Sequence, residues 1–262
     1  MKVWTIANQK GGVGKTTTAI ALAGIAAELR ARVLLLDLDP HGSLTAYFRL
    51  NPDQLEASGF KLFEEHKSLS ADFVAQLIQP TPFANIQLIP ASVALATLER
   101  RSIGEGLGLV IKKTLDLVRD DYDFVMLDCP PQLGVLLVNA LAACDQLIIP
   151  VQTEYLAIQG LERILHTLKM LGKSQKNVLP HTVVPVMYDR RTQASIGSLR
   201  TLRNDYTDII WAGKIPVDTR FRDASKAGVP PSIFDPKSRG IIAYRSLFKY
   251  LNDNALKPSS EG

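Results

Sequence analysis

The feature that most constrains the fold is a glycine-rich segment between an apolar run and a helical segment near the N-terminus. Residues 3–7 form the apolar run, residues 8–18 read Asn-Gln-Lys-Gly-Gly-Val-Gly-Lys-Thr-Thr-Thr, and residues 16–30 have helical spacing. Glycines let the backbone curl so that successive N–H groups point at one anion, and the following helix adds the positive end of its dipole. The order strand, glycine loop, helix therefore predicts a phosphate-binding loop.

Two side chains at the end of this loop have predicted roles. Lys15 would neutralise charge on the β- and γ-phosphates of a nucleotide, and the Thr16 hydroxyl would bind Mg²⁺. The strict eight-residue pattern of such loops asks for glycine where this chain has Gln9. We still expect a phosphate loop, because the strand, the Gly-Lys-Thr sequence and the helix all fall where the chemistry needs them.

The rest of the chain alternates short apolar runs with helical segments. Nearly continuous apolar runs are typical of strands covered on both faces. The expected strands are residues 3–7, 33–36, 124–127 and 147–149, with weaker candidates at 85–89, 182–187 and 209–215. The expected helices are residues 16–30, 107–119, 157–171, 195–206 and 241–251. This alternation predicts an α/β fold with a mostly parallel, twisted sheet and helices on both faces.

The length and composition are those of an ordinary globular chain. With 262 residues, 46% hydrophobic and 21% charged, the sequence is neither disordered nor fibrous in character. No Pro/Gly/Ser-rich linker divides it, so we expect one domain over residues 1–256 and a flexible tail at 257–262. Residues 51–68 have the poorest periodicity and are expected to form an irregular surface excursion.

The sequence indicates a cytoplasmic protein. It has no basic segment followed by an apolar stretch at its start, and no apolar run approaches the roughly 20 residues of a membrane crossing. The cysteines, Cys129 and Cys144, cannot build a disulfide framework and lack the Cys-x-x-Cys spacing of a metal or iron–sulfur site. The four histidines show no metal-ligand spacing either. We expect both cysteines to be buried small residues.

Acidic residues follow two of the expected strands. Asp37 and Asp39 end the run at 33–36, and alternation places them on the same side; Asp128 ends the run at 124–127. Each carboxylate alone could cap a helix or pair with a cation. Acids at several strand ends in one such fold favour a metal or a reacting water.

Charge is distributed unevenly along the chain. The net charge is +4, but residues 169–262 carry 16 Lys and Arg against 8 Asp and Glu, so the remainder is acidic. A basic C-terminal third is a candidate footprint for a polyanion, and a solvated basic surface is the alternative.

Residues 10–17, Lys-Gly-Gly-Val-Gly-Lys-Thr-Thr, resemble the deviant Walker A motif of the ParA/MinD family of ATPases. The resemblance implies a single-domain P-loop NTPase that forms a homodimer around ATP and Mg²⁺. It implies that Lys10 reaches across the dimer to the partner's nucleotide, in the role of an arginine finger. The implied ATP-binding residues of this motif are Lys10, Gly11, Gly12, Val13, Gly14, Lys15, Thr16 and Thr17.

The same resemblance implies roles for the acids. Asp39 lies 24 residues after Lys15, where the family places the acid that positions the attacking water, and Asp37 would support the Mg²⁺ shell. The strand ending in Asp128 is similar to the family's Walker B, which makes Asp128 an outer-shell Mg²⁺ ligand. The implied catalytic residues are Lys10, Lys15 and Asp39, and the implied Mg²⁺ residues are Thr16, Asp37, Asp39 and Asp128. Turnover is expected to be slow and stimulated by a partner, with ATP as a timer.

Three C-terminal segments, residues 186–192, 215–224 and 235–240, resemble segments of ParA-type DNA partition ATPases. The resemblance implies that Arg191 and Arg220 hold nonspecific DNA, and the neighbouring charge of Arg222 makes it a further candidate contact; ion pairs with Asp189, Asp218 and Asp223 are the alternative. It also implies that Pro216 and Asp218 line the adenine pocket.

The segment after Asp39, Pro-His-Gly-Ser-Leu-Thr at 40–45, looks more like ParA-like proteins that place chemotaxis arrays at cell poles than like typical partition proteins. No N-terminal helix-turn-helix is seen, so a transcriptional repressor is not expected. The expected partners are a second copy of the chain, nonspecific DNA and a ParB-like or other stimulating protein, at the nucleoid or a pole.

Two other functions are weighed against this one. A MinD-type membrane-surface positioner would need a C-terminal amphipathic helix, but residues 243–251 are short and a polar tail follows, so no membrane anchor is expected. A small-molecule kinase or ligase would leave Lys10 and the basic C-terminal third unexplained.

Overall fold

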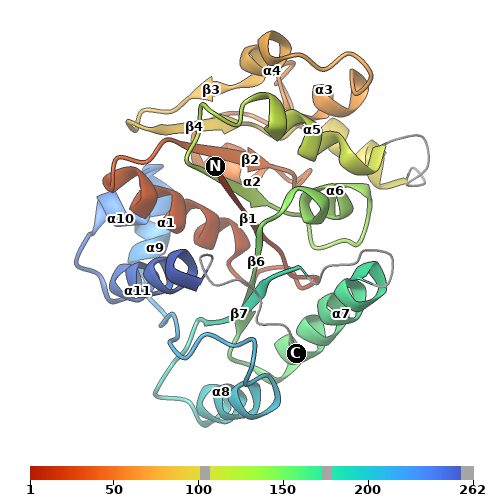
Figure 1. The fold of residues 1–262 in the computed structure, drawn as a ribbon. Helices are drawn as coiled ribbons and strands as arrows, with labels where there is room; N and C mark the ends of the chain where they lie inside the picture. The colour runs from red at the N-terminus through yellow and green to blue at the C-terminus, as the bar shows by residue number, and fades with distance from the viewer. Residues whose placement is uncertain (101–106, 173–178, 255–262) are drawn as a thin grey trace.

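Seven strands form one sheet in the order β3-β4-β2-β5-β1-β6-β7 in the computed structural model, which describes residues 1–100, 107–172 and 179–254 (Figure 1). Every neighbouring pair is parallel except β3 and β4 at one edge, which are antiparallel. The predicted mostly parallel sheet is confirmed. The strands are β1 (Lys2–Ile6), β2 (Val33–Asp37), β3 (Gln79–Pro80), β4 (Ile86–Ile89), β5 (Phe124–Asp128), β6 (Gln146–Gln152) and β7 (His181–Val186).

Helices cover both faces of this sheet, as expected (Figure 1). They are α1 (Lys15–Glu28), α2 (Ser43–Tyr47), α3 (Gly59–Glu64), α4 (Ala71–Leu77), α5 (Val110–Leu117), α6 (Val135–Ala143), α7 (Tyr155–Gly172), α8 (Gln193–Asp205), α9 (Arg220–Ala227), α10 (Pro231–Phe234) and α11 (Arg239–Asn254), with 3₁₀ segments at Val93–Arg100 and Leu107–Leu109.

The core has two layers because side chains alternate across each strand. Leu34 and Leu36 of β2 face a cluster built with α5, α6 and α7, whereas Val33 and Leu35 face a cluster built with α1 and α11. All four are fully buried. Burial on both faces is the physical reason why the strands read as unbroken apolar runs.

The strand expected at residues 209–215 is wrong. This segment pairs with β7 only around Ile210 and again at its end, where the Ile215 N–H donates to the Pro185 carbonyl (2.8 Å). Between these points the chain turns at Gly213, whose backbone lies against the Trp211 indole. Residues 51–68 are not wholly irregular, since they contain α3, and the apolar stretch at 135–143 is helix α6. The predicted tail at 257–262 lies outside the described residues.

The sheet brings the polar strand ends together at one edge. Asp37 at the end of β2 pairs in register with Asp128 at the end of β5, and Asp128 pairs with Ile6 at the end of β1. Ligands of open parallel sheets bind outside the carboxyl ends of the strands.

Within the described residues, no helix is both long and apolar enough to cross a membrane.

Candidate active site

The glycine loop after β1 has the backbone that its sequence predicts. Gly12 and Gly14 have φ values of +76° and +81°, which side chains disfavour, and Gly14 is the N-cap of α1. A Cβ atom added at Gly11 or Gly12 would meet no heavy atom within 4 Å, so the space beside these backbone groups is open. The loop therefore presents peptide groups and a helix N-terminus to a shared opening.

Lys15 lies across this loop. Its side chain is only 7% exposed, and its Nζ donates to the Lys10 carbonyl at 3.4 Å. No ion pair involves Lys15 in the described part of the chain. A buried ammonium with one long hydrogen bond is suited to receive an anion at the loop.

Thr16 and Asp128 meet at the start of α1. The Thr16 hydroxyl donates to Asp128 Oδ2 at 2.6 Å, while Oδ1 of the same carboxylate is buried and has no hydrogen-bond partner among the described residues. Burial, and then the nearby Asp37 charge, raise the pKa of Asp128 well above its usual value. An unpartnered carboxylate oxygen beside a threonine hydroxyl fits the outer shell of a bound Mg²⁺.

Asp37 and Asp39 have different surroundings. Asp37 is fully buried, and its oxygens accept from the backbone N–H of Asp39 (3.1 Å) and from the N–H and hydroxyl of Thr45 (2.8 and 2.7 Å). Asp39 is 15% exposed, and its Oδ1 accepts from the His41 N–H at 3.0 Å and lies 2.8 Å from His41 Nδ1. Asp37 therefore ties the segment after β2 to the sheet, while Asp39 lies closer to solvent.

Lys10 is held within its own chain. Its Nζ forms an ion pair with Glu154, the residue before α7, and the two side chains are 28% and 42% exposed. The Lys10 N–H donates to Asn8 Oδ1 at 3.0 Å, and Asn8 Nδ2 donates to the Pro150 carbonyl at 2.8 Å. The start of the loop is thus fixed to the end of β6, contacts that the sequence analysis missed.

A pocket of about 810 Å³ adjoins the loop. Val13, Gly14 and Thr17 form one side, and the segment 215–219 with Tyr244 forms another. Both residues predicted for the adenine pocket, Pro216 and Asp218, line it. The Asp218 carboxylate already accepts from the Arg220 and Gly240 N–H groups, at 3.0 and 2.9 Å.

Known proteins resemble the chain over almost its whole length. Residues 1–180 match a family described as "AAA domain". Soj, the sporulation initiation inhibitor protein of Bacillus subtilis, is 34% identical over 97% of this chain and 99% of its own. The chromosome partitioning protein ParA of Caulobacter vibrioides is 32% identical over 94% of this chain and 92% of its own. The chain belongs to the ParA/MinD family of P-loop ATPases.

One solved structure that is similar to this chain contains a nucleotide and magnesium. Cobyrinic acid a,c-diamide synthase from Mycobacterium smegmatis, with bound ADP and magnesium, is 31% identical, covers 97% of this chain and 95% of its own, and superposes with a TM-score of 0.79. Structural comparison therefore confirms the P-loop α/β fold that the sequence match to the ParA/MinD family leads us to expect.

The predicted DNA-binding arginines of this ParA/MinD chain are all exposed, and two of them, Arg191 and Arg220, form ion pairs. Arg191 is 80% exposed and bonds Asp189 through Nε and Nη2, at 2.9 and 2.7 Å. Arg220 pairs with Asp235 at 2.9 Å and with Asp223 at 3.6 Å. Arg222 is exposed and lines the pocket beside the phosphate loop. The predicted ion pairs with Asp189 and Asp223 are present, whereas Asp218 forms none among the described residues and Asp235 is an unpredicted partner of Arg220. Exposed pairs of this kind are weak enough to exchange for phosphate.

The cysteines differ in exposure: Cys129 is buried as expected, whereas Cys144 is only partly buried. Cys129 is buried, and burial raises the pKa of its thiol well above the usual value; burial also raises the pKa of Cys144 to about 12. Thiols in this state are poor metal ligands. Within residues 1–100, 107–172 and 179–254, no group of three or more His, Cys, Asp or Glu side chains is arranged around a metal position. A Mg²⁺ site here would draw on Thr16, carboxylates and water, together with phosphate oxygens.

Proposed function

We propose that this chain binds ATP with Mg²⁺ and hydrolyses it slowly as an ATP-dependent homodimer, and that the cycle positions a cargo in the cell. The observation that carries the proposal is that two charged groups, Lys15 and Asp128, are buried at the mouth of the glycine loop. Among the described residues, Lys15 forms no ion pair and Asp128 Oδ1 has no hydrogen-bond partner. Both groups are costly to bury unless a charged ligand completes their surroundings.

The residues divide the work of phosphoryl transfer. The N–H groups of residues 11–17 and the Lys15 ammonium would hold the phosphates, while Thr16 and the carboxylates of Asp128 and Asp37 would support Mg²⁺. Asp39, near solvent, orients the attacking water. Bound Mg²⁺ would neutralise charge on the phosphate oxygens, and most of the rate acceleration is charge stabilisation and positioning. The pocket beside the loop, with Pro216 and Asp218, receives the base.

The nucleotide part is tested with two variants. Lys15→Ala is expected to lose ATP binding, because the buried cation is removed. Asp39→Ala is expected to keep ATP, lose hydrolysis and accumulate as a dimer, measured by phosphate release and light scattering. Asp53→Ala, an exposed acid in a turn, is the matched control. Hydrolysis at the unmodified rate in Asp39→Ala would show that the acid has another role.

The positioning part rests on the named relatives, Soj and a chromosome partitioning ParA, and on the basic C-terminal third. We propose nonspecific DNA as the matrix, held by Arg191, Arg220 and Arg222 at the nucleoid, with hydrolysis stimulated by a ParB-like partner. Placement of a chemotaxis array at a pole is the variant that the segment 40–45 favours.

DNA binding is tested with the Asp39→Ala protein and random-sequence duplex, with ATP and with ADP, over a salt series. ATP alone is expected to support tight binding, with log K falling by about 0.9 per phosphate contact per log unit of salt. Adding Arg191→Glu and Arg220→Glu is expected to abolish DNA binding. The control is Arg119→Glu, which changes an exposed arginine just after α5 and should leave DNA binding intact. ATP-driven dimerisation without DNA binding would move the matrix to a polar scaffold or membrane surface.

A small-molecule ligase is the second candidate, favoured by the likeness to the Mycobacterium smegmatis synthase. The two candidates separate on acceptor dependence. Phosphate release with ATP alone, unchanged by cobyrinic acid and ammonium as a nitrogen donor, fits the positioning ATPase. Release that requires both would favour the ligase.

A further inference from the structure

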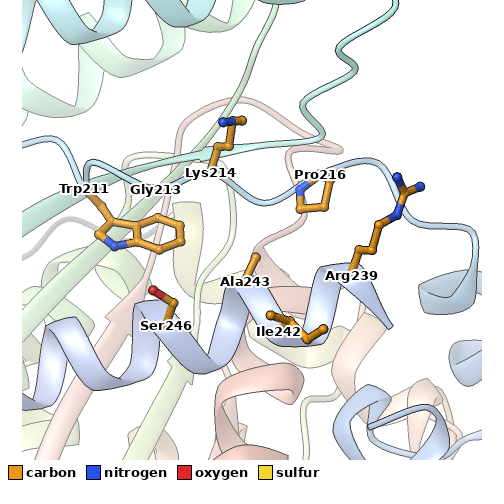
Figure 2. A pocket seen from close by; sticks show the side chains of 8 residues that line it. All are labelled: Trp211, Gly213, Lys214, Pro216, Arg239, Ile242, Ala243 and Ser246. Carbon is orange, nitrogen blue, oxygen red and sulfur yellow. The ribbon is translucent and has the colours of Figure 1, made fainter. Parts of the chain in front are cut away.

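A groove of about 350 Å³ lies between α11 and the segment 211–217 (Figure 2). Figure 2 shows the Trp211 indole and the Pro216 ring on one side, with Ala243 and Ile242 of α11 opposite them. We call it the α11 groove. It is distinct from the pocket beside the phosphate loop, although Pro216 lines both.

The α11 groove is apolar and rigidly built. Ile242 is 58% exposed on α11, a large apolar side chain without cover. Trp211 is only 5% exposed, and a Cβ added at Gly213 would lie 2.2 Å from its ring, so the turn at Gly213 fixes the indole in place. The groove is large enough for one bulky side chain and presents a preformed surface to it.

One end of the α11 groove is strongly basic. Lys214 and Arg239 line both this groove and an adjoining hollow of about 480 Å³, which Arg190 and Arg191 also line. Neither Lys214 nor Arg239 has an ion pair among the described residues; the Lys214 ammonium lies 5.0 Å from the centre of the Tyr188 ring.

The carboxylates of these two hollows leave a net positive charge, because the four basic side chains face only Asp189 and Asp218. Asp189 is engaged by Arg191, and Asp218 by two backbone N–H groups. A ligand that fills both hollows therefore needs several negative charges next to one bulky apolar group. A nucleic-acid backbone supplies the charges but no aliphatic side chain for the groove, whereas an acidic protein segment supplies both.

We propose that the α11 groove docks an acidic segment of a partner protein. One leucine-, isoleucine- or phenylalanine-sized side chain enters between Trp211 and Ile242, and neighbouring carboxylates contact Lys214 and Arg239. The site does not rest on the proposed ATPase activity, because the argument uses no residue of the phosphate loop.

The test is a selection of random heptapeptides displayed on phage against the full chain, followed by affinity measurements on synthetic copies of the enriched peptides. Enriched peptides are expected to carry two or more Asp or Glu beside one bulky apolar residue. Their affinity is expected to fall at least tenfold for Ile242→Glu and for the pair Lys214→Glu with Arg239→Glu. Met170→Glu, which changes an exposed apolar residue on α7, is the matched control and should bind normally.

Three outcomes would overturn the proposal: no enrichment, enriched peptides without the acidic–apolar pattern, or equal binding to Ile242→Glu. Thermal unfolding of each variant separates lost docking from lost folding, and Ala243→Leu, which only fills the groove, gives a second route to the same loss. If duplex DNA binding, rather than peptide binding, falls with Ile242→Glu, the groove belongs to a DNA interface and the proposal is wrong.

Discussion

The carboxylates of the site differ because their hydrogen bonds differ. Burial raises the pKa of Asp37 to about 6, although its bonds from Thr45 and Asp39 favour the charged form. Asp128 is as deeply buried but has one hydrogen bond, to Thr16, and its pKa lies well above the usual value. A divalent cation at this position would favour the charged form of both, so metal binding and deprotonation are coupled.

The ion pair between Lys10 and Glu154 gives a prediction at the scale of single residues. In the proposed dimer Lys10 acts on the partner's nucleotide, so it must leave Glu154 first. Exposed pairs are worth about 0–1 kcal/mol each, and a homodimer releases two of them, so Glu154→Gln should strengthen ATP-dependent dimerisation by up to about 25-fold. Sedimentation of the Asp39→Ala protein measures this, with Glu162→Gln, an exposed acid on α7, as control. Weaker dimerisation would mean that Glu154 itself serves the dimer.

At the scale of elements, the start of α1 depends on the backbone geometry of Gly14, and the helix is then held by side-chain contacts with α11. Gly14 begins α1 with φ of +81°, and the α1 side chain Thr18 lies 2.8 Å, hydroxyl to hydroxyl, from Tyr244 of α11. These contacts hold α1 between the sheet and α11, with its N-terminus directed at the open side of the loop.

Gly14→Ala is expected to lower the free energy of unfolding by about 1–2 kcal/mol, because an alanine is strained in the left-handed region. ATP affinity should fall with it. Gly197→Ala is the matched control: this glycine lies within α8, and an added Cβ would meet nothing within 4 Å. In urea unfolding, Gly197→Ala should raise the free energy of unfolding by about 0.5–1 kcal/mol. Equal changes in the two variants would contradict the backbone argument.

A tether between helices gives a second prediction at this scale. Tyr244→Phe removes the hydroxyl that meets Thr18 in a fully buried position. The free energy of unfolding should fall by about 1–3 kcal/mol, because the buried Thr18 hydroxyl loses this partner. Tyr250→Phe, on the same helix and less buried, should change it by much less. No difference between the two tyrosines would show that the Thr18 contact contributes nothing.

At the scale of the whole molecule, the site joins parts of the chain that are far apart in sequence. The glycine loop, the ends of β2 and β5, the end of β6 and the segment 215–219 all meet at one edge of the sheet. Any ligand that contacts all of them stabilises the folded chain as a unit, since none of these contacts exists in the unfolded chain.

ATP with Mg²⁺ is therefore expected to raise the stability of the entire chain. At a concentration of one hundred times Kd the gain is about 2.7 kcal/mol, roughly 5–10 °C in Tm for a domain of this size. Differential scanning calorimetry with Lys15→Ala should show no such shift, and EDTA should reduce it in the unmodified protein. A full shift in Lys15→Ala would place the nucleotide elsewhere.

The sequence by itself determined the elements whose pattern is local. The glycine loop, the buried parallel strands and the acids at strand ends follow from backbone geometry and from burial on both faces, which leave their marks on neighbouring residues. The strand predicted at residues 209–215 was wrong, because the apolar residues of this segment pack around a turn beside Trp211. Burial explains both patterns, and a single run of apolar residues does not distinguish them.

Only the tertiary structure decided which distant residues meet. Glu154 with Lys10, Thr45 with Asp37, the unpartnered Oδ1 of Asp128, and the α11 groove with its basic end all depend on how crossovers place strand ends and on how α11 packs against the sheet. Such contacts join residues tens to hundreds of positions apart, and no periodicity in the chain encodes them. Local backbone chemistry therefore determines the glycine loop, and the order of the strands determines which residues surround it.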